Sequence, residues 1–121
     1  MLIHATITVR GTPAELAQCE REIRAAFAKA PPDGEVSEQH GTEALRYDLK
    51  VRGGIPFPIF ATVSRDAPAV TIMMEWVNLD AGQSGAATLQ AGRLMRQRER
   101  IRRLWNDIRI EPPVKDRKSV V

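Results

Sequence analysis

The sequence predicts an α+β fold in which two helices pack on one face of an antiparallel sheet of four or five strands. Three patterns favour this fold: two segments alternate apolar with polar residues, a segment between them has helical periodicity, and a later run is strongly apolar. The length of 121 residues suits one hydrophobic core. We expect a single domain over residues 1–110 and a flexible basic tail over residues 111–121.

Two segments predict strands with one buried face. Apolar and polar residues alternate from Ile3 to Val9 and again from Leu45 to Val51. A period of two places every second side chain on the same face of a strand. Residues 31–42, which lie between the two segments, are polar and rich in turn formers, so we expect an exposed connection there.

A helix is expected from Pro13 to Ala30. Thr12 is a capping residue, Pro13 suits the first helical position, and Glu15 can close a capping box. Prolines at positions 31 and 32 end the helix, because the residue before a proline avoids the helical conformation. The buried stripe of this helix is formed by apolar residues at three- and four-residue spacings: Leu16, Cys19, Ile23, Ala26, Phe27 and Ala30.

The most apolar run extends from Val70 to Leu79. It predicts a central strand, because Met73 and Val77 add apolar character to its second face. A short helix is expected before it, over residues 55–65, packed by its apolar side. A turn over residues 80–85 and a short antiparallel strand over residues 86–90 are expected after it.

Two interpretations of the next segment remain open. Arginines on alternate positions favour a solvated edge strand, whereas apolar residues at helical spacings, namely Leu94, Ile101, Trp105 and Ile108, favour a terminal amphipathic helix. We favour a strand that runs into a turn or short helix near Trp105.

The expected order, strand–helix–strand–helix–strand–strand, is that of a ferredoxin-like split βαβ sandwich. Right-handed crossovers place both helices on one face of its sheet. In this arrangement the strand from Val70 to Leu79 would separate the first two strands.

Short motifs spread over residues 1–102 resemble a known family. They are Gly11-Thr-Pro-Ala-Glu15 after the opening strand, Gly53-Gly54-Ile55-Pro56, Ser64-Arg65-Asp66-Ala67-Pro68, and the hairpin around Glu75-Trp76. In these features the chain resembles the plasmid- and phage-borne YubB-type family of ferredoxin-like domains. The resemblance implies the fold and a mobile-element setting, and it carries no catalytic residues.

The formal net charge of +3 is unevenly distributed. Residues 1–92 contain 8 Lys or Arg and 11 Asp or Glu, which gives −3, whereas residues 93–121 contain 10 Lys or Arg and 4 Asp or Glu, which gives +6. The single Cys19 cannot form an internal disulfide, and no leader or membrane-length apolar run is present. We therefore expect a cytoplasmic protein without membrane association.

The basic segment is the candidate nucleic-acid-binding site. Arginine suits bidentate contacts to phosphate, and an aromatic residue such as Trp105 or Tyr47 can stack on a base. The alternative is that the charges protect a sheet edge from aggregation or pair with the acidic residues of the body. The candidate residues are Arg93, Arg96, Arg98, Arg100, Arg102, Arg103 and Trp105.

Other chemistry has little support in the sequence. His4, His40 and Cys19 lack the spacing of a zinc site, so we expect no metal and no cofactor, with Cys19 buried and His40 solvated in a loop. Ser84 lies in a Gly-x-Ser-x-Ala sequence and is interpreted as a turn residue. Arg10 and Asn78 are offered as phosphate ligands only by analogy with enzymes on this fold.

We expect a small binding module and no enzyme. Association with a protein partner, including a homodimer formed through the open face or an edge of the sheet, is the first hypothesis, because Met73 and Val77 would form an exposed apolar patch. Binding of nucleic-acid phosphates by the Arg93–Arg103 segment is the alternative, and a phosphate-handling enzyme is the third.

Overall fold

The computed structural model describes residues 2–78 and 80–101. Arg102, Arg103, Trp105 and the tail expected over residues 111–121 lie outside this range. The elements are β1 (Leu2–Arg10), α1 (Pro13–Lys29), β2 (Gly34–His40), β3 (Ala44–Arg52), α2 (Phe57–Asp66), β4 (Thr71–Asn78), β5 (Gln83–Gln90) and β6 (Arg93–Ile101). None of the helices in the described range is both long and apolar enough to cross a membrane.

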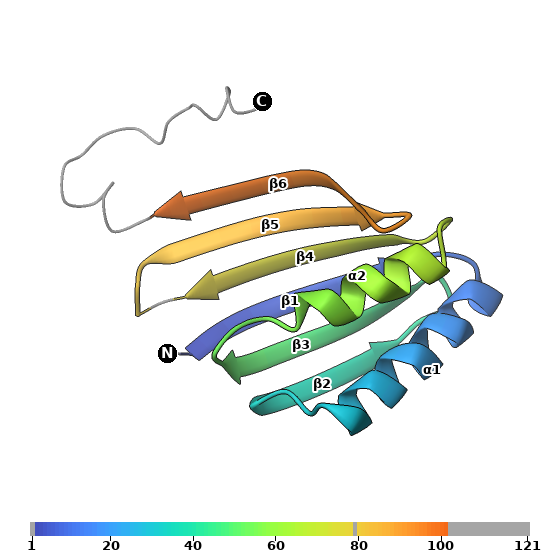
Figure 1. Cartoon of the computed structure of the whole chain (residues 1–121), viewed down its shortest axis with the longest axis horizontal. Coiled ribbons are helices and arrows are strands. Elements are labelled where there is room, and N and C mark those ends of the chain that lie inside the picture. The colour runs from blue at the N-terminus through green and yellow to red at the C-terminus, as the bar shows by residue number, and fades with distance from the viewer. Residues whose placement is uncertain (1, 79, 102–121) are drawn as a thin grey trace.

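The strands form one antiparallel sheet in the order β2-β3-β1-β4-β5-β6, and both helices lie on the same side of it (Figure 1). The α+β class and the single helical layer are confirmed. The expected number of four or five strands is wrong, because the described sheet has six.

The extra strand is β2, in the segment that was expected to be a connection. All seven of its residues are exposed, so it has no apolar alternation that could reveal it. Gly34 begins it with a φ of 150°, and a Cβ at this position would lie 2.0 Å from the backbone oxygen of Lys50. An edge strand needs backbone pairing on one side only, and β2 obtains it from β3.

The expected neighbours in the sheet were also wrong, for the same reason. β1 pairs directly with β3, from Leu2 opposite Arg52 to Arg10 opposite Ala44, and β4 pairs on the other side of β1. The strand that follows α1 is β2, and the β2–β3 hairpin then places β3 between β2 and β1. The prediction that β4 is an interior strand is confirmed, since it lies between β1 and β5.

The start of α1 agrees with its sequence signals. The Thr12 hydroxyl accepts a hydrogen bond from the Glu15 backbone N–H at 3.3 Å, and the Glu15 carboxylate accepts one from the Thr12 N–H at 2.8 Å. This reciprocal pair satisfies two N–H groups that a helix start leaves free. Leu16, Cys19 and Ile23 are buried, as the apolar stripe predicts.

The core lies between the helices and one face of the sheet. Alternate residues of β1, β3 and β4 face the helices, and an aromatic group formed by Phe27, Tyr47 and Phe60 joins α1, β3 and α2 with ring-centroid distances of 6.1–6.4 Å. Edge-to-face contacts of this kind add to the free energy of burying the rings.

The segment after Gly92 is a strand, as we favoured. Ala91 and Gly92, with φ of 54° and 76°, form the two-residue turn between β5 and β6. This is the geometry that a tight hairpin requires. The expected turn over residues 80–85 is too long, because β5 already begins at Gln83, and Ser84 is therefore a strand residue.

Candidate functional site

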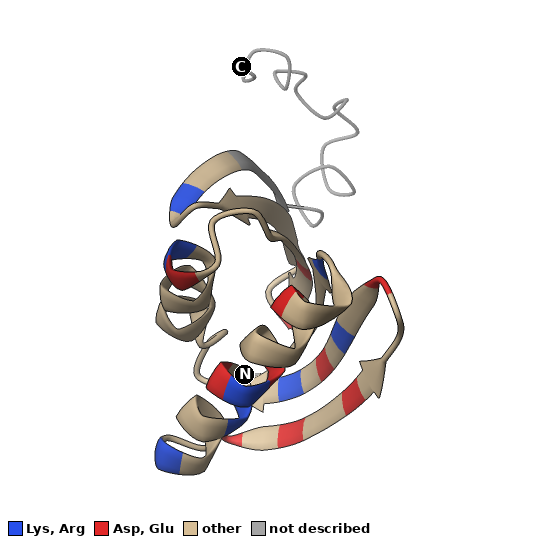
Figure 2. Cartoon of the chain, turned by 90° about the vertical axis from the view of Figure 1, so that its right-hand side faces the viewer, with Lys and Arg blue, Asp and Glu red and all other residues tan. Residues whose placement is uncertain are grey.

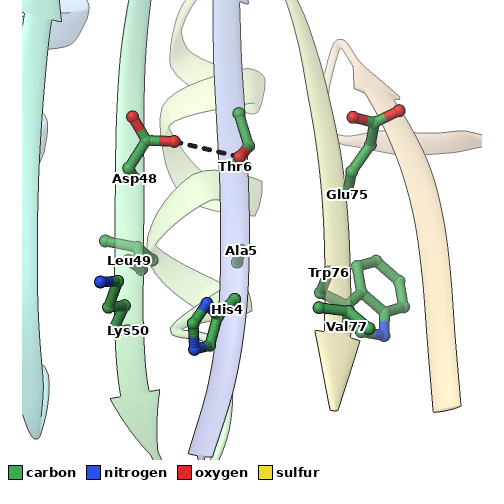
Figure 3. Close-up of a pocket in the computed structure, with 9 residues that line it drawn as sticks. All are labelled: His4, Ala5, Thr6, Asp48, Leu49, Lys50, Glu75, Trp76 and Val77. Atoms are coloured by element: carbon green, nitrogen blue, oxygen red, sulfur yellow. Dashed lines mark hydrogen bonds between the residues drawn. The ribbon is translucent and has the colours of Figure 1, made fainter. Parts of the chain in front are cut away.

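Within residues 2–78 and 80–101, no element covers the face of the sheet opposite the helices (Figure 1), and this face contains a shallow depression of about 400 Å³. Figure 3 views this face with the helices behind the strands. β1, β3 and β4 supply the lining residues because they are the central strands of the sheet. These are His4, Ala5, Thr6, Asp48, Leu49, Lys50, Glu75, Trp76 and Val77.

Hydrogen bonds connect the polar groups on one side of the depression. The Thr6 hydroxyl donates to Asp48 Oδ1 at 3.0 Å, across the β1–β3 pair (Figure 3). The Arg46 guanidinium donates to the same carboxylate, with Nε 3.2 Å from Oδ2. Asp48 therefore accepts hydrogen bonds from residues of both β1 and β3.

Apolar side chains lie on the other side, on β4. Met73 is 41% exposed, and Val77 is partly buried. Both alternate with the core residues Ile72 and Met74, so they point away from the helices. The apolar second face that the sequence indicates for this strand is therefore open to solvent within the described chain.

The register of β6 places four of the six candidate arginines along one strand. Arg93 pairs with Gln90, Arg96 with Thr88, Arg98 with Ala86, and Arg100 with Ser84, with an irregularity in the ladder between Thr88 and Leu89. Arg93 is exposed.

Tyr47 cannot stack on a base, contrary to the sequence-based suggestion. It is fully buried under α1, and its partners are Phe27 and Phe60. Its alternation with Leu45 and Leu49 was the signal for this burial. Trp76 also belongs to the helix side and packs against the core. Among the described residues, the uncovered face therefore offers no aromatic platform.

A second group of polar residues lies where α1 meets β2. His40 Nε2 is 3.2 Å from Glu38 Oε1 and 3.7 Å from Glu20 Oε2. Arg24 contacts Glu20 and lies 3.5 Å from Glu38. The expectation that His40 lies in a loop is wrong, since it is a residue of β2, whereas its expected exposure to solvent is confirmed. Sequence reasoning missed this group because it missed β2.

The Tyr47 hydroxyl lies close to the same group and has no hydrogen-bond partner in the structure. Burial raises the pKa of Tyr47, and the carboxylates of Glu38 and Glu20 raise it further. Burial also raises the pKa of Cys19 to about 11, which agrees with its expected role as a small apolar residue.

Arg10 and Asn78, the two phosphate ligands suggested by fold analogy, do not lie close together. Arg10 pairs with Thr71 at one end of β1, whereas Asn78 pairs with Ile3 near the other end. Seven residues of strand separate the two positions by roughly 23 Å. Asn78 is buried, and its side chain accepts a hydrogen bond from the Ala81 N–H at 3.3 Å. The pair therefore cannot bind one phosphate.

Comparison with known proteins finds no family model that matches the chain, no similar curated protein and no similar solved structure.

Proposed function

We propose that the chain is a small non-enzymatic accessory module that associates with a second copy of itself through the uncovered face of the sheet. The main observation behind the proposal is that both helices lie on one side of the sheet (Figure 1), which leaves Met73 exposed and Val77 partly exposed on the opposite face. Burial of apolar surface is the main favourable term in most protein association.

Charged residues of both signs lie on the strands of the sheet (Figure 2). Arg46, Lys50 and Arg52 are exposed on β3, on one side of β1, whereas Glu75 is exposed on β4, on the other side. A two-fold axis parallel to β1 would place β3 of one copy over β4 of the other. This axis leaves the position along the strands unchanged, so Asp48 would lie over Glu75 of the second copy, because both residues pair with Thr6. Arg46 and Lys50 would lie over Met73 and Val77, where their aliphatic stems can cover the apolar side chains.

The polar groups of the depression favour binding over a reaction. Both carboxylate oxygens of Asp48 accept hydrogen bonds from Thr6 or Arg46. Because both oxygens already bind donors within the chain, this carboxylate is poorly placed to contact a substrate proton.

We also propose that the elements from β1 to β4 form a ferredoxin-like unit, extended by the β5–β6 hairpin. The element order β1-α1-β2-β3-α2-β4 and the strand order β2-β3-β1-β4 support this assignment. The resemblance to the YubB-type family agrees with it, and the mobile-element setting remains a proposal.

Light scattering at increasing concentration tests the association. We expect a dimer, and we expect the double variant Met73→Lys/Val77→Lys to be monomeric, because two charges in the centre of the interface would be buried without partners. The matched control is Ala25→Lys/Ala28→Lys, which adds the same charge at exposed positions of α1 and should remain dimeric. A native chain that is monomeric at millimolar concentration contradicts the proposal.

Binding of nucleic-acid phosphates by β6 is the second candidate function. The strand conformation favours it, because arginines at alternate positions of a strand are about 7 Å apart, similar to the spacing of phosphates along a nucleic-acid strand. The absence of aromatic residues from the uncovered face in the described range argues that such binding would be independent of sequence.

A further inference from the structure

The contact between α1 and the edge strand β2 brings together three side chains that can act as metal ligands. We propose that Glu20, Glu38 and His40 form a binding site for a divalent transition-metal ion of the zinc class. This inference does not depend on the proposed self-association, because the site lies on the helix side of the sheet.

The fold explains why these three residues meet. Glu38 and His40 are two residues apart on β2, opposite the buried Tyr47 and Leu45 of β3, so both point to the side of the sheet that α1 covers. Glu20 extends from α1 towards them. The site therefore links α1 to β2, two elements that make few other contacts among the described residues.

The distances between the ligand atoms suit a small tetrahedral ion. His40 Nε2 lies 3.2 Å from Glu38 Oε1 and 3.7 Å from Glu20 Oε2, and all three atoms are within 4.8 Å of one another. Ligand atoms about 2.0–2.2 Å from a tetrahedral zinc ion are roughly 3.3–3.5 Å apart. Only small side-chain movements are needed to reach that geometry.

The donor types agree with this class of ion. Imidazole nitrogen and carboxylate oxygen are both ligands that bind zinc, and two carboxylates neutralise the charge of the ion. Ligands from three residues leave a fourth position for a water molecule.

An independent observation comes from Tyr47. This residue is fully buried, lies opposite Glu38 in the strand register, and has a hydroxyl without a hydrogen-bond partner. Glu38, Glu20 and Arg24 all act electrostatically on this hydroxyl, so it lies near the cluster. A buried hydroxyl without a partner is costly, and a water molecule on a bound ion would be a suitable partner.

Arg24 is the competitor for this site. Its guanidinium contacts Glu20 and lies 3.5 Å from Glu38, so it is the cation that now balances both carboxylates. The Arg24 side chain is 63% exposed and can turn into solvent without leaving a buried charge. If the cluster is a metal site, removal of this guanidinium should tighten metal binding.

A zinc titration of the full chain, followed by competition with a chromophoric chelator, tests the proposal. We expect one equivalent of zinc to bind and the thermal unfolding midpoint to rise with zinc concentration. Glu38→Gln and His40→Ala should each weaken binding by at least about 10-fold. Both positions are exposed, so circular dichroism should show that the variants remain folded.

Two further variants make the result decisive. Arg24→Gln should bind zinc more tightly than the native chain, whereas an ion-pair cluster with no affinity for metal would lose stability and gain no zinc. His4→Ala removes the other histidine, on the uncovered face, and should leave binding unchanged. Absence of a saturable equivalent in both the native chain and Arg24→Gln, or binding that is lost in His4→Ala and kept in His40→Ala, overturns the proposal.

Discussion

The hydroxyl of Ser64 accepts a hydrogen bond from the backbone N–H of Gly92 at 3.0 Å. Ser64 is fully buried on α2, and Gly92 is in the turn between β5 and β6, 28 residues later in the chain. The bond thus fastens the turn of the last hairpin to the helical layer, and it accounts for a serine at a core position of α2.

Replacement Ser64→Ala should destabilise the fold by about 1–3 kcal/mol, because the partly buried Gly92 N–H loses its acceptor. Urea unfolding measures the change, and hydrogen exchange should show faster opening of β5 and β6 than of β1 and β3. Thr62→Ala, at an exposed position of the same helix, is the control and should change the stability by less than about 0.5 kcal/mol. Equal effects of the two variants would show that the bond contributes nothing.

Gly85 on β5 lies directly beneath the indole of Trp76. A Cβ at position 85 would be 2.3 Å from Trp76 Cζ2, so Gly85→Val must displace the ring. We expect a loss of stability of about 1–3 kcal/mol and a shift of the Trp76 fluorescence maximum. The measurement uses a Trp105→Phe background, because the chain contains two tryptophans. Ala86→Val, on the opposite face of the same strand, should leave the emission unchanged.

The nucleic-acid alternative makes a prediction about salt dependence. If β6 binds phosphates, replacement of Arg96, Arg98, Arg100 and Arg102 by serine should abolish binding to a single-stranded oligonucleotide and flatten the slope of log K against log salt. Fluorescence anisotropy at several salt concentrations measures both quantities. A native chain that binds neither DNA nor RNA at low salt eliminates this function.

Stability should decrease at alkaline pH. The pKa of Cys19 is raised from 9.0 to about 11 in the folded chain, mainly by burial, and that of Tyr47 is also raised. The folded state therefore retains protons that the unfolded state releases, and the free energy of unfolding falls as the pH rises from about 9 to 11. Cys19→Ala should reduce this slope in urea unfolding measured at several pH values. An unchanged slope would mean that the thiol does not contribute.

Local signals were sufficient to predict α1 and β1. A capping box, a proline at the first helical position and a stripe of apolar residues all act within a few residues, and the structure contains each of them. The burial of Tyr47 could also have been predicted, since it shares a face with Leu45 and Leu49. This buried position does not allow the stacking role suggested for its ring.

β2 and its consequences could not be predicted in this way. Its residues are stabilised by backbone pairing with β3 and not by burial, so their side chains carry no pattern. Because β2 was not predicted, the neighbours of β1 were assigned incorrectly. The proximity of His40 to Glu20 could not be predicted either. The cluster on the edge strand depends on register, which is set by the hairpin and by Gly34, and not by the composition of the segment.

The central place of β1 in the sheet affects how the chain is made. Leu2 pairs with Arg52 on one side, and Ile3 pairs with Asn78 on the other. β1 precedes both of its neighbours in the chain, and its second neighbour, β4, is translated only after β2, β3 and α2. Until β4 has been synthesised, one hydrogen-bonding edge of β1 lacks its native partner and is open to non-native pairing during synthesis.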